Sequence, residues 1–149
     1  AEANPIPEIW PWEAKEAGAR VVATGRSDFP NQINNSLGFP AVFRGILTVR
    51  SRKMTDSMFI AAAEALVKYA EQRGIHEEYI IPTMEEAEAY VVEAIAVAEK
   101  AMEEGVARRK ISRTELEEEI RELIMRPRKY MKIALEEELI RVESRYFEN

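Results

Sequence analysis

The chain has 149 residues, of which 46% are apolar and 32% charged, and its formal net charge is −6. The length fits one ordinary domain, while the absence of cysteine excludes disulfides and thiolate metal sites, and a lone His76 excludes a site built from several imidazoles. No uncharged apolar run approaches the roughly 20 residues of a membrane span. Ala1–Trp12 also lacks the apolar core of a signal peptide. We therefore expect a soluble cytoplasmic protein without membrane contact.

The numbers of charged and amide residues indicate which partners and which growth temperature suit this protein. The acidic net charge and the shortness of the basic clusters at 108–110 and 126–129 argue against nucleic acid as a partner. Only five Asn and two Gln accompany 27 acidic and 21 basic residues, a composition reported for proteins of hot environments. We expect a thermostable protein that keeps amides where they are needed, and three Asn and one Gln fall within Asn31–Asn35.

The first part of the chain predicts a short helix, a buried strand and a polar loop. Pro11 suits the first turn of a helix over Pro11–Ala17, which Gly18 ends. The short, β-branched run Ala19–Thr24 then predicts a buried strand. Ser, Asp, Pro and Asn make the following segment, Arg26–Asn35, a polar loop.

Apolar residues spaced by three and four predict helices over most of the remaining chain. Asn34, Asn35 or Ser36 could cap the first of them, and the pairs Thr83 with Glu86 and Ser112 with Glu115 read as capping boxes. Pro127 is expected to interrupt the charged region into two helices. The predicted helices are Leu37–Val49, Asp56–Arg73, Thr83–Glu104, Ser112–Met125 and Arg128–Tyr146.

A single buried strand needs neighbouring strands to pair with, and the sequence predicts almost none. Unpaired backbone groups cost roughly 1–3 kcal/mol each, so Ala19–Thr24 requires neighbouring strands. Only Ala1–Asn4 offers the end of a second strand. We therefore expect that the chain is a fragment whose sheet lies mostly elsewhere. Composition changes near Arg108, which predicts a core region over 1–110 and a charged helical tail over 111–149.

Five segments carry a resemblance to a known family. They are Ala3–Ile9 (ANPIPEI), Ala23–Asn35 (ATGRSDFPNQINN), Phe39–Gly45, Tyr79–Pro82 and Ala101–Arg108. In order and spacing they resemble the malic enzymes of prokaryotic type. The thirteen residues of Ala23–Asn35 are the specific part, the match extends over 3–110, and 111–149 matches nothing that we can place.

The resemblance implies an α/β fold, namely the C-terminal part of a Rossmann-like nicotinamide-binding domain over 1–110 that is mostly helical in this chain. It implies hydride transfer from malate to NAD or NADP, followed by decarboxylation to pyruvate and CO₂ with a divalent metal, Mg or Mn. It places Asn4 at both nicotinamide and substrate, Asn34 at malate and cofactor, and Asn35 at malate. The amide chemistry agrees, because a carboxamide can bind a carboxylate or a nicotinamide amide and has no pKa in the working range.

The resemblance also implies that essential parts are missing. The phosphate-binding G-x-G-x-x-G, the catalytic Tyr, the Lys base and the metal-binding carboxylates of the family all lie upstream. We expect the isolated chain to be inactive, to need the N-terminal part of the same enzyme as its partner, and to belong to a homo-oligomer. The sequence leaves the choice between NAD and NADP open.

Other interpretations of the same residues remain open. The alternative function is a free-standing helical interaction or oligomerisation module without catalysis, supported by the amphipathic tail. Asn34 and Asn35 could simply cap a helix. Asp28 is expected to pair with Arg26 and hold the loop, and Trp10 and Trp12 to pack the short helix onto a sheet.

Overall fold

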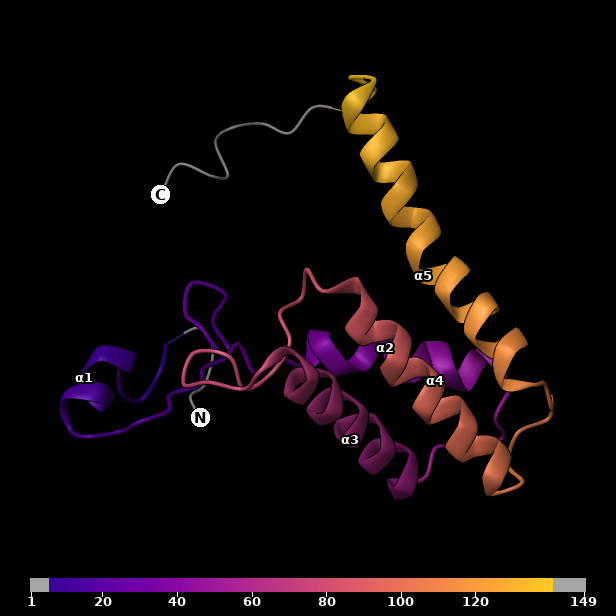
Figure 1. Ribbon diagram of the computed structural model, residues 1–149, viewed down its shortest axis with the longest axis horizontal. Coiled ribbons are helices and arrows are strands. Elements are labelled where there is room, and N and C mark those ends of the chain that lie inside the picture. Colours follow the sequence, from indigo (N-terminus) through magenta and orange to yellow (C-terminus); the bar gives the residue numbers. More distant parts are fainter. Residues whose placement is uncertain (1–5, 141–149) are drawn as a thin grey trace.

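A computed structural model describes residues 6–140, and within that range five helices carry the fold (Figure 1). Helices α2, α3 and α4 form the body, and α5 begins on this body and projects away from it. Helix α1 lies apart, in a lobe of loops near the N-terminal end. The helices span Pro11–Glu16 (α1), Asn35–Thr48 (α2), Asp56–Arg73 (α3), Ala87–Glu103 (α4) and Arg113–Glu136 (α5).

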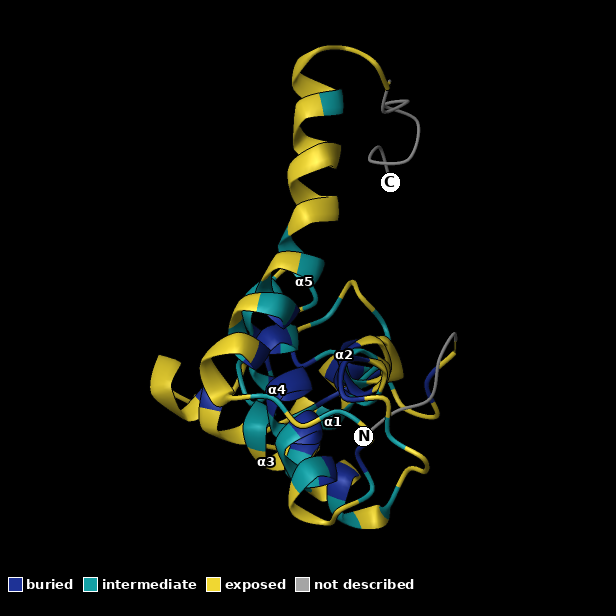
Figure 2. Cartoon of the chain, turned by 90° about the vertical axis from the view of Figure 1, so that its right-hand side faces the viewer, coloured by how far each residue is buried: buried dark blue, intermediate teal, exposed yellow. Residues whose placement is uncertain are grey.

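Helix α4 is the centre of the body, because it packs against α2, α3 and α5 (Figure 2). Its sequence is rich in alanine and valine, and small side chains let neighbouring backbones approach closely. The closest approach is at Gly45 of α2, where an added Cβ would lie 2.4 Å from the Ala94 carbonyl oxygen and 2.9 Å from the Val97 Cβ. The buried core residues from α4 are Val91, Ala94, Ile95, Val97, Ala98 and Ala101.

The helix ends agree in part with the sequence-based expectations. The Ser112–Glu115 capping box is present at the start of α5. The pair Thr83 and Glu86 acts differently, since the Glu86 carboxylate accepts the Thr83 N–H at 2.8 Å but α4 starts only at Ala87. The same carboxylate accepts the Tyr79 hydroxyl at 3.0 Å, so it organises the preceding loop instead of a first helical turn.

The predicted strand Ala19–Thr24 is wrong for the described residues. Only Thr24 pairs, in an isolated parallel bridge with Gln32, and Val21 is 43% exposed. The physical reason is that no second strand lies beside this segment within residues 6–140, so its backbone has no ladder to join. The expected neighbour, Ala1–Asn4, lies outside the described residues.

Two other expectations need correction. Pro127 does not divide the charged region, because α5 runs through it without a break. Proline removes one helical hydrogen bond, but Arg, Met, Lys and Leu around it are good helix formers and sustain the helix on both sides. Trp10 and Trp12 do not pack on a sheet; they stack on each other at 4.8 Å, and both rings lie against Phe29 of the polar loop.

Helix α5 has two different halves. Leu116 and Ile120 of its first half are buried in the core formed with α4. Beyond Pro127 the helix is mostly exposed to solvent (Figure 2).

Among residues 6–140 no helix has the length and apolarity needed to cross a bilayer. The division of the chain at residue 110 stays a prediction.

Candidate functional site

Asn34 stands where the polar loop enters α2. It is the N-cap residue, with extended backbone angles, and its Oδ1 accepts the Ser36 N–H at 3.0 Å and the Ser36 hydroxyl. Its Nδ2 donates to the Gly25 carbonyl at 3.2 Å. The capping role expected as an alternative is therefore present. Since a carboxamide nitrogen carries two hydrogens, one N–H of Asn34 remains for a ligand.

Asn35 is the first residue of α2 and is exposed. It stands at the start of a 14-residue helix, where the positive end of the helix dipole favours an anion. The third predicted contact, Asn4, lies outside the described residues. Asn34 and Asn35, which are neighbours in the chain, thus both stand at the start of α2.

Asn31 holds the loop that presents these two residues, and sequence reasoning did not single it out. It is 5% exposed and its Nδ2 donates to the carbonyls of Val22 and Glu77 at 3.0 and 2.8 Å. Its Oδ1 accepts the Ile80 N–H at 2.9 Å. One side chain therefore joins three loop segments. Its backbone angle φ is 57°, a region that asparagine tolerates better than most residues, and no sequence signal distinguishes it from the neighbouring amides.

The polar loop has a second fixed point in an ion pair. The Arg26 guanidinium donates to both oxygens of Asp28 at 2.8 and 2.6 Å, as the sequence led us to expect. This hydrogen bonding is the main cause of the lowered pKa of the Asp28 carboxyl. The guanidinium also lies 5.4 Å from the centre of the Trp10 ring, so the pair attaches α1 to the loop.

An apolar cavity of about 500 Å³ opens beside the first turn of α2. Its walls come from α2 and α3, with Phe39, Phe43 and Phe59 among them. A single carboxylic acid, Glu93 of α4, also lines it. Glu93 is 1% exposed, and burial raises its pKa to about 8. The sequence around Glu93, between Val92 and Ala94 in a helical pattern, did not indicate that its carboxyl group would be buried.

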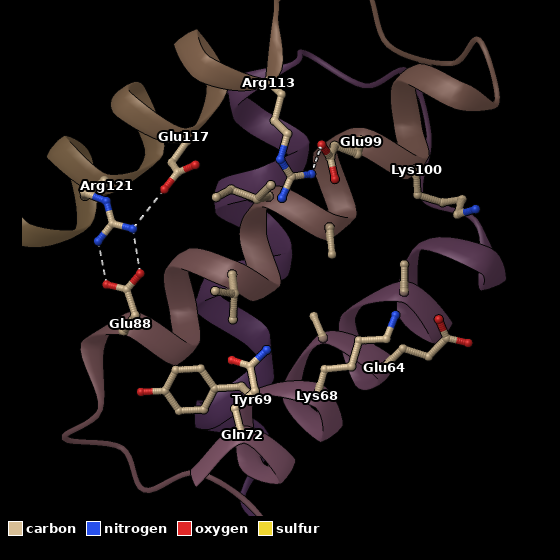
Figure 3. A pocket seen from close by; sticks show the side chains of 15 residues that line it. Glu64, Lys68, Tyr69, Gln72, Glu88, Glu99, Lys100, Arg113, Glu117 and Arg121 are labelled. Atoms are coloured by element: carbon tan, nitrogen blue, oxygen red, sulfur yellow. Dashed lines mark hydrogen bonds and ion pairs between the residues drawn. The ribbon is translucent and has the colours of Figure 1, made fainter.

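A second cavity, of about 470 Å³, lies among α3, α4 and α5 and is charged (Figure 3). Arg121 of α5 donates to both oxygens of Glu88 of α4 at 2.5 and 2.6 Å and to Glu117 at 3.2 Å. Arg113 of α5 forms a single ion pair with one carboxylate oxygen of Glu99 on α4. Because these charges satisfy one another, we interpret this cavity as the ionic attachment of α5 to the body.

Comparison with known proteins gives the family context. The family described as "Malic enzyme, NAD binding domain" matches residues 18–102. The bifunctional malic/malolactic enzyme of Bacillus subtilis is 48% identical over 123 residues, which are 83% of this chain and 30% of that protein. The NAD-dependent malic enzyme of Geobacillus stearothermophilus is 50% identical over 111 residues, or 73% of this chain and 23% of that protein.

Solved structures agree. The malic enzyme of Entamoeba histolytica superposes with a TM-score of 0.89 at 47% identity, over 92% of this chain and 28% of that one. The malic enzyme of Pyrococcus horikoshii Ot3 gives 0.76 at 58% identity, over 82% of this chain and 28% of that one. The chain therefore spans less than a third of the relatives that it matches.

Proposed function

The chain belongs to the malic enzyme family, and we propose that it is the C-terminal part of the nicotinamide-binding region of an enzyme that converts malate to pyruvate and CO₂ while reducing NAD or NADP. The family match over residues 18–102 and the small share of each relative that the chain spans support this proposal. The Rossmann-like sheet, in this proposal, is contributed by the remainder of the enzyme.

The observation that carries the proposal is the pair of amides at the start of α2. A malate carboxylate at this position would meet the free N–H of Asn34 and the side chain of Asn35, at the positive end of the α2 dipole. The amides hold the substrate without charge and do not compete for the hydroxyl proton. Asn34 and Asn4 are also proposed to contact the nicotinamide.

The chain supplies binding and orientation in this proposal, and the remainder supplies the chemistry. Within residues 6–140, no group of three histidine, aspartate or glutamate side chains is placed to hold a metal ion. The described residues therefore do not fit the divalent metal, Mg or Mn, that assists decarboxylation in the proposal, and the metal belongs to the remainder. Removal of the hydroxyl proton also needs a base from outside this part of the chain. We propose that the isolated chain is inactive.

The test replaces the matching stretch of the Pyrococcus horikoshii malic enzyme by this chain and measures malate-dependent reduction of NAD and of NADP in the presence of Mn²⁺. We expect turnover by this chimera and none by the 149-residue chain alone. A folded chimera that reduces neither cofactor with malate would refute the proposed function.

The site is tested in the same chimera with Asn35→Asp. The new carboxylate repels the substrate carboxylate and removes an amide donor, so we expect the KM for malate to rise about tenfold or more, since a hydrogen bond to a charged group contributes roughly 1.5–3 kcal/mol. The matched control is Gln72→Glu, the same amide-to-acid change at an exposed position on α3. Equal effects of the two changes would argue against Asn35 as a malate contact.

The alternative of a helical interaction module without catalysis is not favoured by the family match. Homo-oligomer formation stays a prediction.

A further inference from the structure

One face of the body exposes several large apolar side chains to solvent. Phe39 and Phe43 of α2 are 61% and 40% exposed, and their ring centres lie 4.6 Å apart. Phe59 of α3 and Met54, which precedes α3, are also exposed beside the same cavity. Exposed apolar groups of this size that adjoin one another mark an interaction surface. We call the surface formed by Phe39, Phe43, Met54 and Phe59 the aromatic face.

Beneath this face lies a carboxyl group that lacks a partner. Oε2 of Glu93 is buried and has no hydrogen-bond partner among the described residues. Burial is the only cause of its raised pKa, so no cation within residues 6–140 offsets the loss of water. A buried acceptor without a donor costs about 1–3 kcal/mol, or more when it is charged.

Glu93 borders the cavity. Gly38 of α2 lies directly over its carboxyl group, and a Cβ on Gly38 would stand 3.3 Å from Glu93 Oε1. A larger residue at this position would therefore crowd the carboxylate, which the glycine avoids. Every other residue that lines the cavity is apolar, apart from Asn35 at its edge. An occupant that suits this site is apolar over most of its surface and carries one hydrogen-bond donor.

The source of that occupant follows from the length of the relatives. Two solved malic enzymes align with most of this chain, yet the aligned part is 28% of each of them. Most of a complete enzyme therefore lies outside the segment to which the aromatic face belongs, and an internal interface accounts for exposed phenylalanines better than solvent does.

We propose that the aromatic face is an internal interface of the complete enzyme, covered by an apolar segment of the remainder, which places a hydrogen-bond donor on Glu93 through the cavity. This proposal rests on the proposed function for the existence of that remainder. Beyond the proposed function, it names the surface that is covered, the apolar nature of the covering segment, and Glu93 as the residue that accepts its hydrogen bond.

Accessibility tests the interface directly, because the chain contains no cysteine and a single one can be introduced. Ala63 is exposed and lines the cavity, so Ala63→Cys reports on its mouth. We expect rapid maleimide labelling in the 149-residue chain and labelling slowed roughly tenfold or more in the chimera, whose other cysteines are replaced by serine.

The matched control is Lys129→Cys on the exposed outer half of α5. We expect it to react at the same rate in both proteins. Equal labelling of Ala63→Cys in the two proteins, or equal protection of both positions, would overturn the proposed interface.

The donor is tested by the sign of a stability change. In the 149-residue chain, Glu93→Leu removes an unpartnered buried carboxyl group, and we expect the Tm to rise by several degrees. In the chimera the same change leaves the donor of the covering segment without its acceptor, and we expect the Tm to fall. Glu93→Gln, which keeps an acceptor oxygen, is expected to lose less than Glu93→Leu in the chimera.

The control for this experiment is Glu118→Leu, an exposed glutamate of α5, with little change expected in either protein. A rise of the Tm with Glu93→Leu in both proteins would exclude a donor on Glu93. Neither labelling nor Tm depends on turnover. A chimera that shows the protection and the change of sign but does not oxidise malate would refute the proposed function and leave the interface standing.

Discussion

The four asparagine and glutamine positions of the polar loop do different work. Asn31 is buried and fully engaged, Asn34 caps a helix and keeps one N–H free, and Asn35 faces solvent. Gln32 makes only a long contact, 3.4 Å, to the Gly25 carbonyl. The loop therefore has one structural amide behind the two proposed to meet the ligand, and the three can be separated by mutation.

Asn31→Asp is expected to destabilise the 149-residue chain by about 2 kcal/mol or more. The carboxylate cannot donate to the Val22 and Glu77 carbonyls, and each buried group left unpaired costs about 1–3 kcal/mol. Urea unfolding measures the loss. The neighbouring change Gln32→Glu gives up one weak contact, so its effect is expected to be smaller, and a reversed order would contradict the role of Asn31.

The sequence could predict the cap but not the anchor. Asn34, Asn35 and Ser36 precede an apolar helical pattern, which predicts an N-cap among them, and the structure assigns it to Asn34. The partners of Asn31 at 77 and 80 are more than 40 residues away, so no local pattern reveals them. Glu93 was missed for a similar reason. An amphipathic reading of α4 assumes one buried stripe, whereas this helix is covered by three others.

At the scale of elements, the close contact between α2 and α4 depends on one glycine, Gly45, which has no side chain. Gly45→Ala would place a Cβ 2.4 Å from the Ala94 carbonyl oxygen, and that atom belongs to the backbone of a central helix. We expect a loss of stability of about 1–3 kcal/mol from forced separation of the two helices, although alanine is the better helix former.

Thermal unfolding of the 149-residue chain measures this change. Leu47→Ala is the control, because Leu47 lies on the same helix and is 60% exposed. A Gly45→Ala variant as stable as the original chain would show that the helices separate without cost.

Helices were the predictable elements, and the strand and the proline were not. Periodic apolar spacing and the Ser112 capping box fixed α2, α3 and the start of α5 from local chemistry. A strand instead depends on distant partners, and the β-branched run 19–24 finds none within residues 6–140. Pro127 was given too much weight, because a long helix with strong formers on both sides tolerates the loss of one hydrogen bond.

At the scale of the whole molecule, stability is expected to come from the body and not from the projecting helix. Leu116 and Ile120 anchor α5 in the core, while residues 129–140 are mostly exposed. Deletion of residues 130–149 is therefore expected to change the unfolding free energy little. Leu116→Ala, which leaves a cavity in the core, is expected to cost about 2–5 kcal/mol.

Urea unfolding of the two variants checks this division. Equal losses would show that the outer half of α5 contributes as much as the buried half. The expected contrast would show that the buried half of α5 carries its contribution to folding.

The ion pairs of Arg121 with Glu88 and Glu117 make the attachment of α5 sensitive to temperature and to salt concentration. Water holds ions less favourably as it warms, so removing these groups from water costs less in a hot medium. Dissolved salt has the opposite consequence, because mobile ions shield half-exposed charges from each other. The ionic attachment of α5 is thus expected to hold better in hot solution and to weaken in concentrated salt.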